Sequence, residues 1–177
     1  IRLEAGRTSP MLGICPNGTV TVDWGDGTEP DTLTGTSRTT VKYTPTHNYA
    51  AAGDYVISLT IDGVAGLYSI SSTNEYSCLL RYSKGADSRN AVYQNAIRKV
   101  EIGNGITHLN GYDFQSCSGL KSITIPNAVS SIGHGIFMNC YSLSSVSLSS
   151  SITNIYSDMF NGCYSLSSVS LPNSITN

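Results

Sequence analysis

Charged residues are scarce in this sequence. Asp, Glu, Lys and Arg make up 12% of its 177 residues, and the formal net charge is −2. No run of Lys or Arg is present to neutralise a phosphate backbone, so we expect no nucleic-acid partner. No stretch approaches the roughly 18 consecutive apolar residues that cross a bilayer, so we expect no membrane insertion in this segment.

Motifs of catalysis are missing as well. The sequence has no G-x-S-x-G, no H-E-x-x-H and no glycine-rich phosphate loop. Its serines have no general base at a matching spacing, and His108 and His134 fall at unrelated positions that we interpret as solvated turns. We therefore predict that the protein is not an enzyme and needs no cofactor.

The sequence also lacks the cysteine pattern of a disulfide framework or a zinc site. The number of cysteines is odd, which argues against complete disulfide pairing. None belongs to a C-x-x-C motif, and no histidine lies nearby at metal-ligand spacing. The five cysteines are Cys15, Cys78, Cys117, Cys140 and Cys163.

What the sequence does contain is abundant Ser, Thr, Asn, Gly and Tyr, beside an ordinary apolar share of 40%. This composition is typical of a β-rich extracellular protein. The length suits one domain or two small ones. The sequence begins at Ile1 without a secretory signal and ends partway through a repeated pattern, so we expect the natural polypeptide to be longer.

A 23-residue repeat fills the second half of the sequence. Three full units and a partial fourth begin at Val100, Ile123, Val146 and Val169. The other recurrent columns are Ile102, Ile125, Leu148 and Leu171; Ile106, Val129, Ile152 and Ile175; Leu109, Ile132 and Ile155; Phe114, Phe137 and Phe160; Cys117, Cys140 and Cys163; and Leu120, Leu143 and Leu166.

The repeat predicts stacked units. Each contains L-x-x-[IV]-x-[IL], whose last residues alternate as in a strand with one apolar face. One short strand cannot bury that face, so equivalent strands are expected about 4.8 Å apart in a parallel sheet. Residues 131–140 would return the chain as a short turn or helix that inserts Phe137 into the core. Phe should then stack on Phe, and Cys on Cys.

The three repeated cysteines admit two interpretations. Cys117, Cys140 and Cys163 can form a redox site, or they can form a ladder of buried thiols that pack as small hydrophobic groups. The other columns of the repeat consist of core residues, which favours the ladder.

The pattern resembles the BspA-type leucine-rich repeat over about residues 100–177. The resemblance rests on Ile125-Pro126-Asn127, Ile132-Gly133, Ile136-Phe137, Asn139-Cys140, Leu143, Phe160-Asn161-Gly162-Cys163, Leu166 and Val169. It implies a bacterial surface or secreted protein involved in adhesion. The asparagine ladder of eukaryotic leucine-rich repeats is absent, because Ala128, Ser151 and Ser174 lie near its place.

Residues 1–64 do not follow this period. The runs 19–22 and 55–61 alternate apolar and polar residues as half-buried strands do. Between them, Trp24-Gly25-Asp26-Gly27 has turn chemistry, with glycines for positive φ and aspartates that accept from nearby amides. Short strands joined by such turns predict a β-sandwich.

This part resembles a polycystic-kidney-disease (PKD) domain, whose hallmarks are W-x-F-G-D-G-T and H-x-Y-x-x-x-G-x-Y-x-V-x-L. The first reads 23–28 here and is one residue shorter, and the second begins at His47. The resemblance implies an extracellular spacer or interaction module with a structural His47. Because some PKD domains bind calcium, Asp23 and Asp26 are candidate calcium ligands. The alternative, which we favour, is that both aspartates brace the turn.

Residues 65–99 connect the two parts. The run 86–97 places Ala91, Val92, Ala96 and Ile97 at helix-compatible spacing. A repeat array needs an atypical first unit over its exposed edge. We therefore interpret 65–99 as a connector with an N-terminal capping repeat that makes the junction stiff.

The exposed columns of the repeat form a candidate ligand face. The outward strand column reads Glu101, Thr124, Ser147, Ser170, so the face changes from charged to hydroxyl-rich. It can present hydrogen bonds to a glycan or a protein, or it can be an ordinary solvated face. Tyr141, Tyr164 and the separate Tyr156 can form an aromatic stripe at an interface, or they can cover the core.

Together these patterns predict a mainly β protein, with an immunoglobulin-like (PKD-like) β-sandwich over 1–64, a connector over 65–99 and a leucine-rich-repeat solenoid over 100–177. We expect a non-catalytic scaffold for adhesion or recognition at a bacterial surface, with a protein or glycan partner. The alternatives are a receptor-binding protein of a phage tail or injection device, and an accessory module of a secreted hydrolase.

Overall fold

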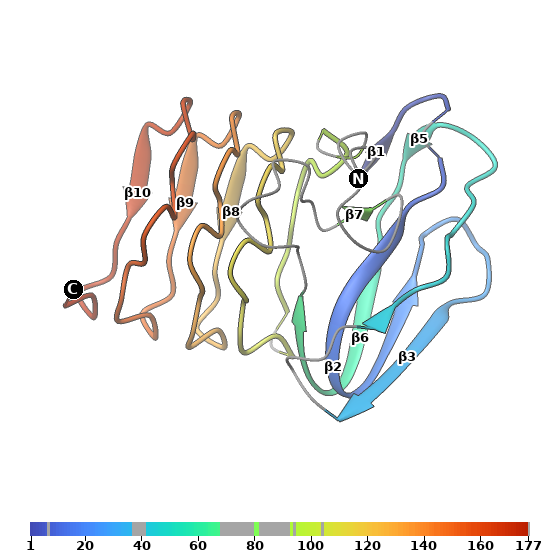
Figure 1. Ribbon diagram of the computed structural model, residues 1–177, viewed down its shortest axis with the longest axis horizontal. Helices are drawn as coiled ribbons and strands as arrows, with labels where there is room; N and C mark the ends of the chain where they lie inside the picture. The colour runs from blue at the N-terminus through green and yellow to red at the C-terminus, as the bar shows by residue number, and fades with distance from the viewer. Residues whose placement is uncertain are drawn as a thin grey trace.

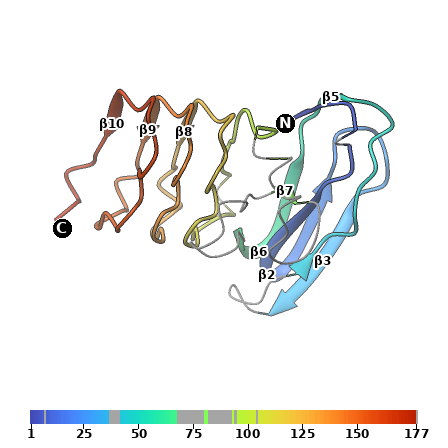
Figure 2. The ribbon, with the colours of Figure 1, turned by 45° about the horizontal axis from the view of Figure 1, so that its top comes forward.

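The protein has two β-rich parts that lie side by side (Figure 1). The computed structural model describes residues 1–6, 8–36, 42–67, 80–81, 93, 95–103 and 105–176. The front part carries twisted sheets, and the second part is a row of stacked turns of chain, which we call rungs (Figure 2). The N-terminus lies where the two parts meet, and the C-terminus lies at the far end of the row.

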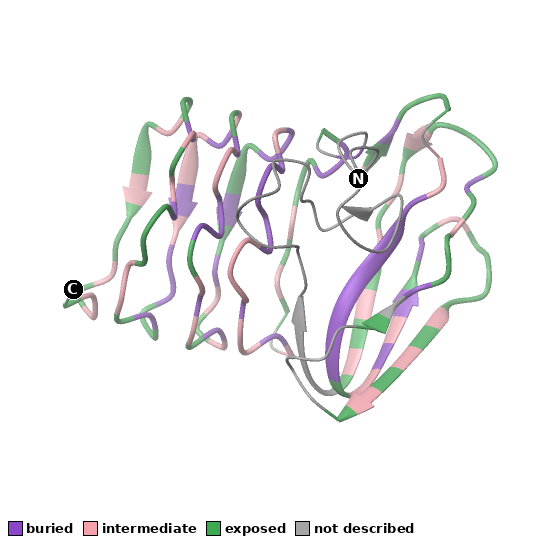
Figure 3. Cartoon of the chain, viewed as in Figure 1, coloured by how far each residue is buried: buried purple, intermediate pink, exposed green. Residues whose placement is uncertain are grey.

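Strand β2 (Met11–Asp23) organises the front part. It pairs antiparallel with β3 (Asp31–Thr36), β4 (Lys42–Tyr43), β6 (Ser58–Leu67) and β7 (Leu80–Arg81) in one five-stranded sheet. Most of β2 is buried, as its purple colour in Figure 3 shows. A second sheet pairs β1 (Arg2–Leu3) with β5 (Gly53–Asp54).

The predicted strand at 19–22 is confirmed as part of β2, and the predicted run 55–61 enters β6 at Ser58. Val20 and Val22 are fully buried, as the alternation required. Strand β6 continues to Leu67, beyond the expected end of the front unit at residue 64. The sandwich arrangement itself stays a prediction.

The turn after β2 is held by aromatic packing. The indole of Trp24 is buried, and its N–H donates to Oδ2 of Asp31 at 2.8 Å. The ring of His47 stacks on that indole, with the ring centroids 4.7 Å apart. The hydroxyl of Tyr49 donates to the carbonyl oxygen of Trp24 at 2.8 Å. Residues distant in sequence therefore fix this turn.

The second part stacks with the 23-residue period. Strands β8 (Ser122–Thr124), β9 (Ser145–Ser147) and β10 (Ser168–Ser170) pair in parallel, each residue opposite the one 23 positions later. The expected phenylalanine column is confirmed, because the rings of Phe114 and Phe137 stack at 5.9 Å and those of Phe137 and Phe160 at 6.0 Å. Equivalent side chains thus share one interior.

The return arms are turns. Residues 134–139 adopt turn conformation, and Phe137 is fully buried, as expected. Backbone N–H groups of one arm donate to carbonyls of the next, as from Phe137 to Met159 at 3.1 Å. Two positions in every arm have positive φ: Tyr112, Gly135 and Asp158 in one column, and Ser116, Asn139 and Gly162 in the other.

The cysteine column lies in the core. Cys117 and Cys140 are fully buried and Cys163 is 9% exposed, which confirms the expectation of buried thiols. The thiols of Cys140 and Cys163 also donate hydrogen bonds to backbone carbonyls of the preceding rung. They are therefore polar links between rungs as well as packing groups.

Serine hydroxyls link the rungs where the asparagine ladder is missing. The hydroxyl of Ser151 donates to the carbonyl oxygen of Asn127 at 2.9 Å, and that of Ser174 donates to the carbonyl oxygen of Ile152 at 2.6 Å. The side-chain oxygen of Asn127 accepts from the backbone N–H of Ser150 at 3.1 Å. These bonds join the turns of neighbouring rungs.

Candidate functional site

The outward strand column forms a short polar row. Thr124 lies opposite Ser147, and Ser147 lies opposite Ser170, in the parallel register of β8, β9 and β10. Thr124 and Ser170 are exposed, and Ser147 is half-buried. The structure thus brings three of the four predicted residues of this column onto one sheet face.

Glu101, the fourth residue of the column, is exposed and forms an ion pair with Lys99. The hydrogen bond from Lys99 lowers the pKa of the Glu101 carboxyl below its ordinary value. Both side chains are more than three-quarters exposed, so this pair contributes little to stability.

A neighbouring column of serines is already used within the protein. The hydroxyl of Ser144 donates to the carbonyl oxygen of Lys121 at 3.0 Å, and the hydroxyl of Ser167 donates to the carbonyl oxygen of Ser144 at 3.0 Å. These two hydroxyls hold adjacent rungs together. The hydroxyl-rich face therefore offers fewer donors to a ligand than the sequence alone suggests.

Tyr141 and Tyr164 form an exposed aromatic pair. Their rings are nearly parallel, 6° apart, with centroids separated by 5.7 Å. Tyr141 is 46% exposed and Tyr164 is 85% exposed, so they do not simply cover the core. Tyr156 packs separately, with its ring edge-on to His134 at 5.3 Å. The predicted stripe is thus a stacked pair with a distinct third tyrosine.

Asp23 and Asp26 are both engaged in the turn after β2. Oδ1 of Asp23 accepts from the amide of Gly25 at 2.8 Å. Oδ1 of Asp26 accepts from the hydroxyl of Thr28 at 2.7 Å, and its Oδ2 lies 2.9 Å from Nε2 of His47. The hydrogen bonds from Thr28 and then from His47 lower the pKa of Asp26 to about 2.

These contacts favour the turn-bracing interpretation of the two aspartates. Within the described ranges, no three or more His, Cys, Asp and Glu side chains gather in a way that could hold a metal ion. Calcium binding at this turn stays a prediction from resemblance alone.

The other two histidines differ in setting. His134 is exposed, as expected for a turn, and its Nδ1 lies 3.3 Å from the hydroxyl of Ser157. His108 is half-buried and forms a parallel bridge with Ser131. The expectation of a turn at His108 is therefore wrong, because its backbone joins the rung-to-rung pairing, while the residue stays partly exposed.

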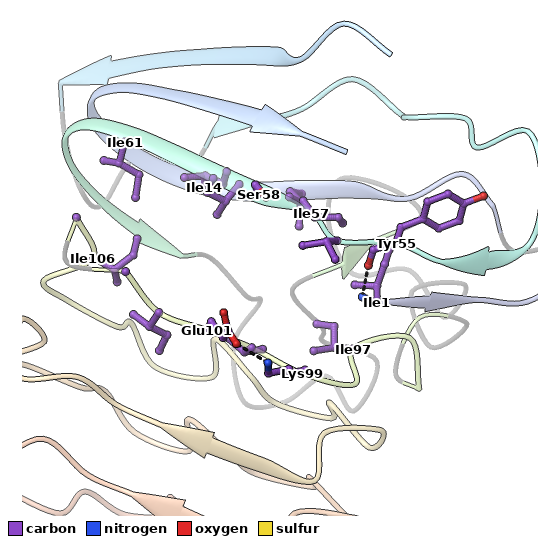
Figure 4. A pocket seen from close by; sticks show the side chains of 17 residues that line it. Ile1, Ile14, Tyr55, Ile57, Ser58, Ile61, Ile97, Lys99, Glu101 and Ile106 are labelled. Carbon is purple, nitrogen blue, oxygen red and sulfur yellow. Dashed lines mark hydrogen bonds and ion pairs between the residues drawn. The ribbon is translucent and has the colours of Figure 1, made fainter. Parts of the chain in front are cut away.

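Sequence reasoning did not find a cavity of about 760 Å³ between the two parts (Figure 4). One wall comes from β6 and the residues before it, with Ile57, Leu59 and Ile61. The other wall comes from the first rung, with Val100 and Ile102 among its residues. The signal in the sequence that could have indicated this cavity is the alternation of apolar residues in both segments. Each alternating segment has one apolar face that must pack against another part of the protein.

The comparisons with known proteins concern mainly the repeats. The family described as the BspA type leucine rich repeat region matches residues 88–177, in 6 copies. No curated protein matches the sequence. In the part of the chain that the structure describes, no helix has the length and apolarity to cross a membrane.

Among solved structures, a leucine rich cell surface protein from Faecalibacterium prausnitzii A2-165 is similar to this chain at 34% sequence identity, with a TM-score of 0.45. The match covers 62% of this chain and 26% of that protein, so this chain spans about a quarter of its length. The family match covers just over half of the 177 residues. The chain therefore belongs to the BspA-type leucine-rich repeat family.

Proposed function

We propose that this chain is a non-catalytic recognition module at a bacterial surface, and that its stacked rungs present the binding face. The face consists of Tyr141 and Tyr164 with the polar column Glu101, Thr124, Ser147 and Ser170. The carrying observation is the stacked tyrosine pair, which leaves aromatic surface in water. Exposed tyrosine commonly marks interfaces, because it adds large contact area at a low entropic cost.

The proposed partner is a protein rather than a glycan. The two tyrosine rings are nearly parallel and already stack on each other at 5.7 Å, so a sugar ring has no room between them. Their edges, hydroxyls and outer ring faces stay available, which suits protein side chains. A glycan that binds across the hydroxyl column is the second candidate, supported by the exposed Thr124 and Ser170.

We also propose a role for each of three segments of the chain. Residues 1–64 serve as a PKD-like spacer, 65–99 as connector and capping repeat, and 100–177 as the recognition array. Support for a stiff junction comes from the backbone N–H of Arg2, which donates to the carbonyl oxygen of Ala96 at 2.8 Å. The turn chemistry at Asp23 and Asp26 is a structural part of the spacer in this scheme.

A binding assay on cells tests the proposal. The fluorescently labelled 177-residue chain is titrated onto host epithelial cells, beside a Tyr141→Ala/Tyr164→Ala variant and a Tyr156→Ala control. Loss of two interface tyrosines should weaken saturable binding at least tenfold, since each such residue contributes about 1–2 kcal/mol or more. The control should bind as the parent does.

Enzymatic treatment of the cells then separates the two partner classes. Protease treatment should abolish binding, whereas glycosidase treatment should leave it intact. The reverse pattern identifies a glycan. Equal binding by the double variant and the parent contradicts the assignment of this face.

A further inference from the structure

The cavity between the two parts has two aliphatic walls that face each other (Figure 4). Ile57, Leu59 and Ile61 on the sheet side are only half-buried, although they alternate as a core face would. Val100 and Ile102 on the rung side are half-buried too. Apolar groups on both sides of one gap are thus incompletely covered by the protein itself.

The cavity is closed where the two walls meet. A Cβ added to Gly105 would lie 3.2 Å from Cβ of Ile61, so the two parts are in close contact there. The buried side chains of Leu12, Ile14 and Ile97 also line the cavity. A ligand in this space would therefore lie against aliphatic groups of both walls.

Polar groups among the described lining residues are few, and three of them carry charge. One is the N-terminal ammonium of Ile1, which donates to the carbonyl oxygen of Tyr55 at 2.6 Å. Lys99 and Glu101 line the cavity, and their side chains are 77% and 78% exposed. They pair with each other at the surface, where an ion pair is weak and readily exchanged for another. Lys99 is thus a cation placed beside an aliphatic cavity.

We infer that this cavity binds one long aliphatic chain that carries an anionic head group, as in a fatty acid. Its volume, about 760 Å³, lies in the range of small-molecule sites, about 300–1,000 Å³. Among the described residues that line the cavity, aliphatic side chains predominate over the convergent polar groups that a sugar or a nucleotide needs. The aliphatic tail of the ligand packs between the two walls. Its carboxylate head forms an ion pair with Lys99 and takes the place of the Glu101 carboxylate.

Titration of straight-chain fatty acids tests this site. Decanoate, dodecanoate and tetradecanoate are titrated calorimetrically, below their micelle concentrations, into the 177-residue chain. One equivalent should bind, and each added CH₂ should tighten binding up to about fourfold, because burial of a CH₂ contributes about 0.8 kcal/mol. Non-saturable uptake, or affinity that does not rise with chain length, overturns the inference.

Filling the cavity provides the steric test. A Cβ at Gly103 meets no atom within 4 Å, and its φ is outside the left-handed region, so Gly103→Leu introduces bulk without backbone strain. Tetradecanoate should bind at least tenfold more weakly to this variant. Ser165→Leu, which adds the same side chain on the exposed arm of the last full rung, should bind as the parent does. Equal affinity of Gly103→Leu and the parent overturns the site.

Charge changes at the exposed ion pair test the head-group contact without altering the core. Lys99→Met should weaken tetradecanoate binding about tenfold, and Glu101→Gln should strengthen it, because the competing carboxylate is removed. Lys121→Met removes the same charge from the next rung and should have no effect. An unchanged affinity of Lys99→Met, or weaker binding by Glu101→Gln, contradicts the proposed orientation. The Tyr141→Ala/Tyr164→Ala variant should bind the fatty acid as the parent does. Failure of the fatty-acid site can therefore be distinguished from failure of the proposed tyrosine face.

Discussion

The thiol of Cys140 donates a hydrogen bond to the carbonyl oxygen of Phe114, with Sγ and oxygen 3.0 Å apart. The two residues are 26 positions apart in sequence and lie in adjacent rungs. Cys163 repeats the bond with Phe137 at 3.1 Å. Each of these cysteine side chains thus fills a core position and also donates a hydrogen bond to a carbonyl group of the neighbouring rung.

Cys140→Ala should lower the free energy of unfolding by about 1–2 kcal/mol, from the lost hydrogen bond and the small cavity left behind. Urea unfolding followed by circular dichroism measures the change. Cys163→Ala should cost less, because Cys163 is 9% exposed whereas Cys140 is fully buried. An equal or larger loss for Cys163→Ala would show that burial does not govern this column.

The buried thiols should resist alkylation. Burial, and then the nearby charge of Asp113, raises the pKa of Cys15 to about 11, and burial also raises the pKa of Cys163. The thiolate is the reactive species, so both groups stay largely protonated at pH 8. In a Cys78→Ser background, mass spectrometry after iodoacetamide treatment should find both unmodified in buffer and modified in urea. Rapid modification in buffer would contradict the buried placement.

Acid should weaken the turn at Asp26. Its pKa is lowered from the ordinary 3.8 to about 2, first by the hydrogen bond from Thr28 and then by that from His47. A carboxyl group with a lowered folded-state pKa stabilises the fold fully above about pH 4, and that stabilisation is lost as the pH falls toward 2. Urea unfolding from pH 5 to pH 2 should show this decline.

Two variants isolate the contribution of this carboxyl group. Asp26→Asn should unfold with a shallower dependence on pH over that interval. Thr28→Val, which removes the hydroxyl donor at nearly constant shape, should raise the folded-state pKa of Asp26, so the loss of stability should be smaller and complete at a higher pH. The same pH dependence in Asp26→Asn as in the parent would exclude Asp26 as its source.

Gly135→Ala should destabilise the repeat by about 1–3 kcal/mol. The φ of Gly135 is +53°, and a Cβ there would lie 2.2 Å from Cε1 of Tyr112. The double variant Tyr112→Gly/Gly135→Ala should recover part of the loss, because the ring that clashes is removed. Gly103→Ala, where a Cβ meets nothing within 4 Å, is the control and should stay within about 0.5 kcal/mol of the parent. Additive losses in the double variant would contradict a direct clash.

Much of the repeat could be predicted from the sequence because its columns are spaced uniformly. Once Ile123 and Val146 are assigned to equivalent places, the parallel register and the stacking of Phe114 on Phe137 follow. The left-handed positions could not be predicted equally well. The glycines at 135 and 162 indicate positions of positive φ, but Tyr112 and Asn139 adopt the same conformation at the equivalent positions of other rungs.

The candidate face was only partly predictable. The sequence places Tyr141 and Tyr164 in one column, and their exposure follows from neither composition nor period. The free hydroxyls were overestimated, because a serine at a rung surface can donate outward or to the preceding rung. Ser144 and Ser167 take the second option.

The sequence by itself determined the 23-residue period, the strands of the repeat and the buried nature of its Phe and Cys columns, because recurrent apolar residues can be covered only by their own equivalents. Only the tertiary structure decided the cavity between β6 and the first rung. Its walls come from residues 57–59 and Ile61 on one side and from residues 99–103 on the other, and these segments share no period. How closely two unrelated apolar faces approach depends on the shapes of both, and no local pattern records that distance.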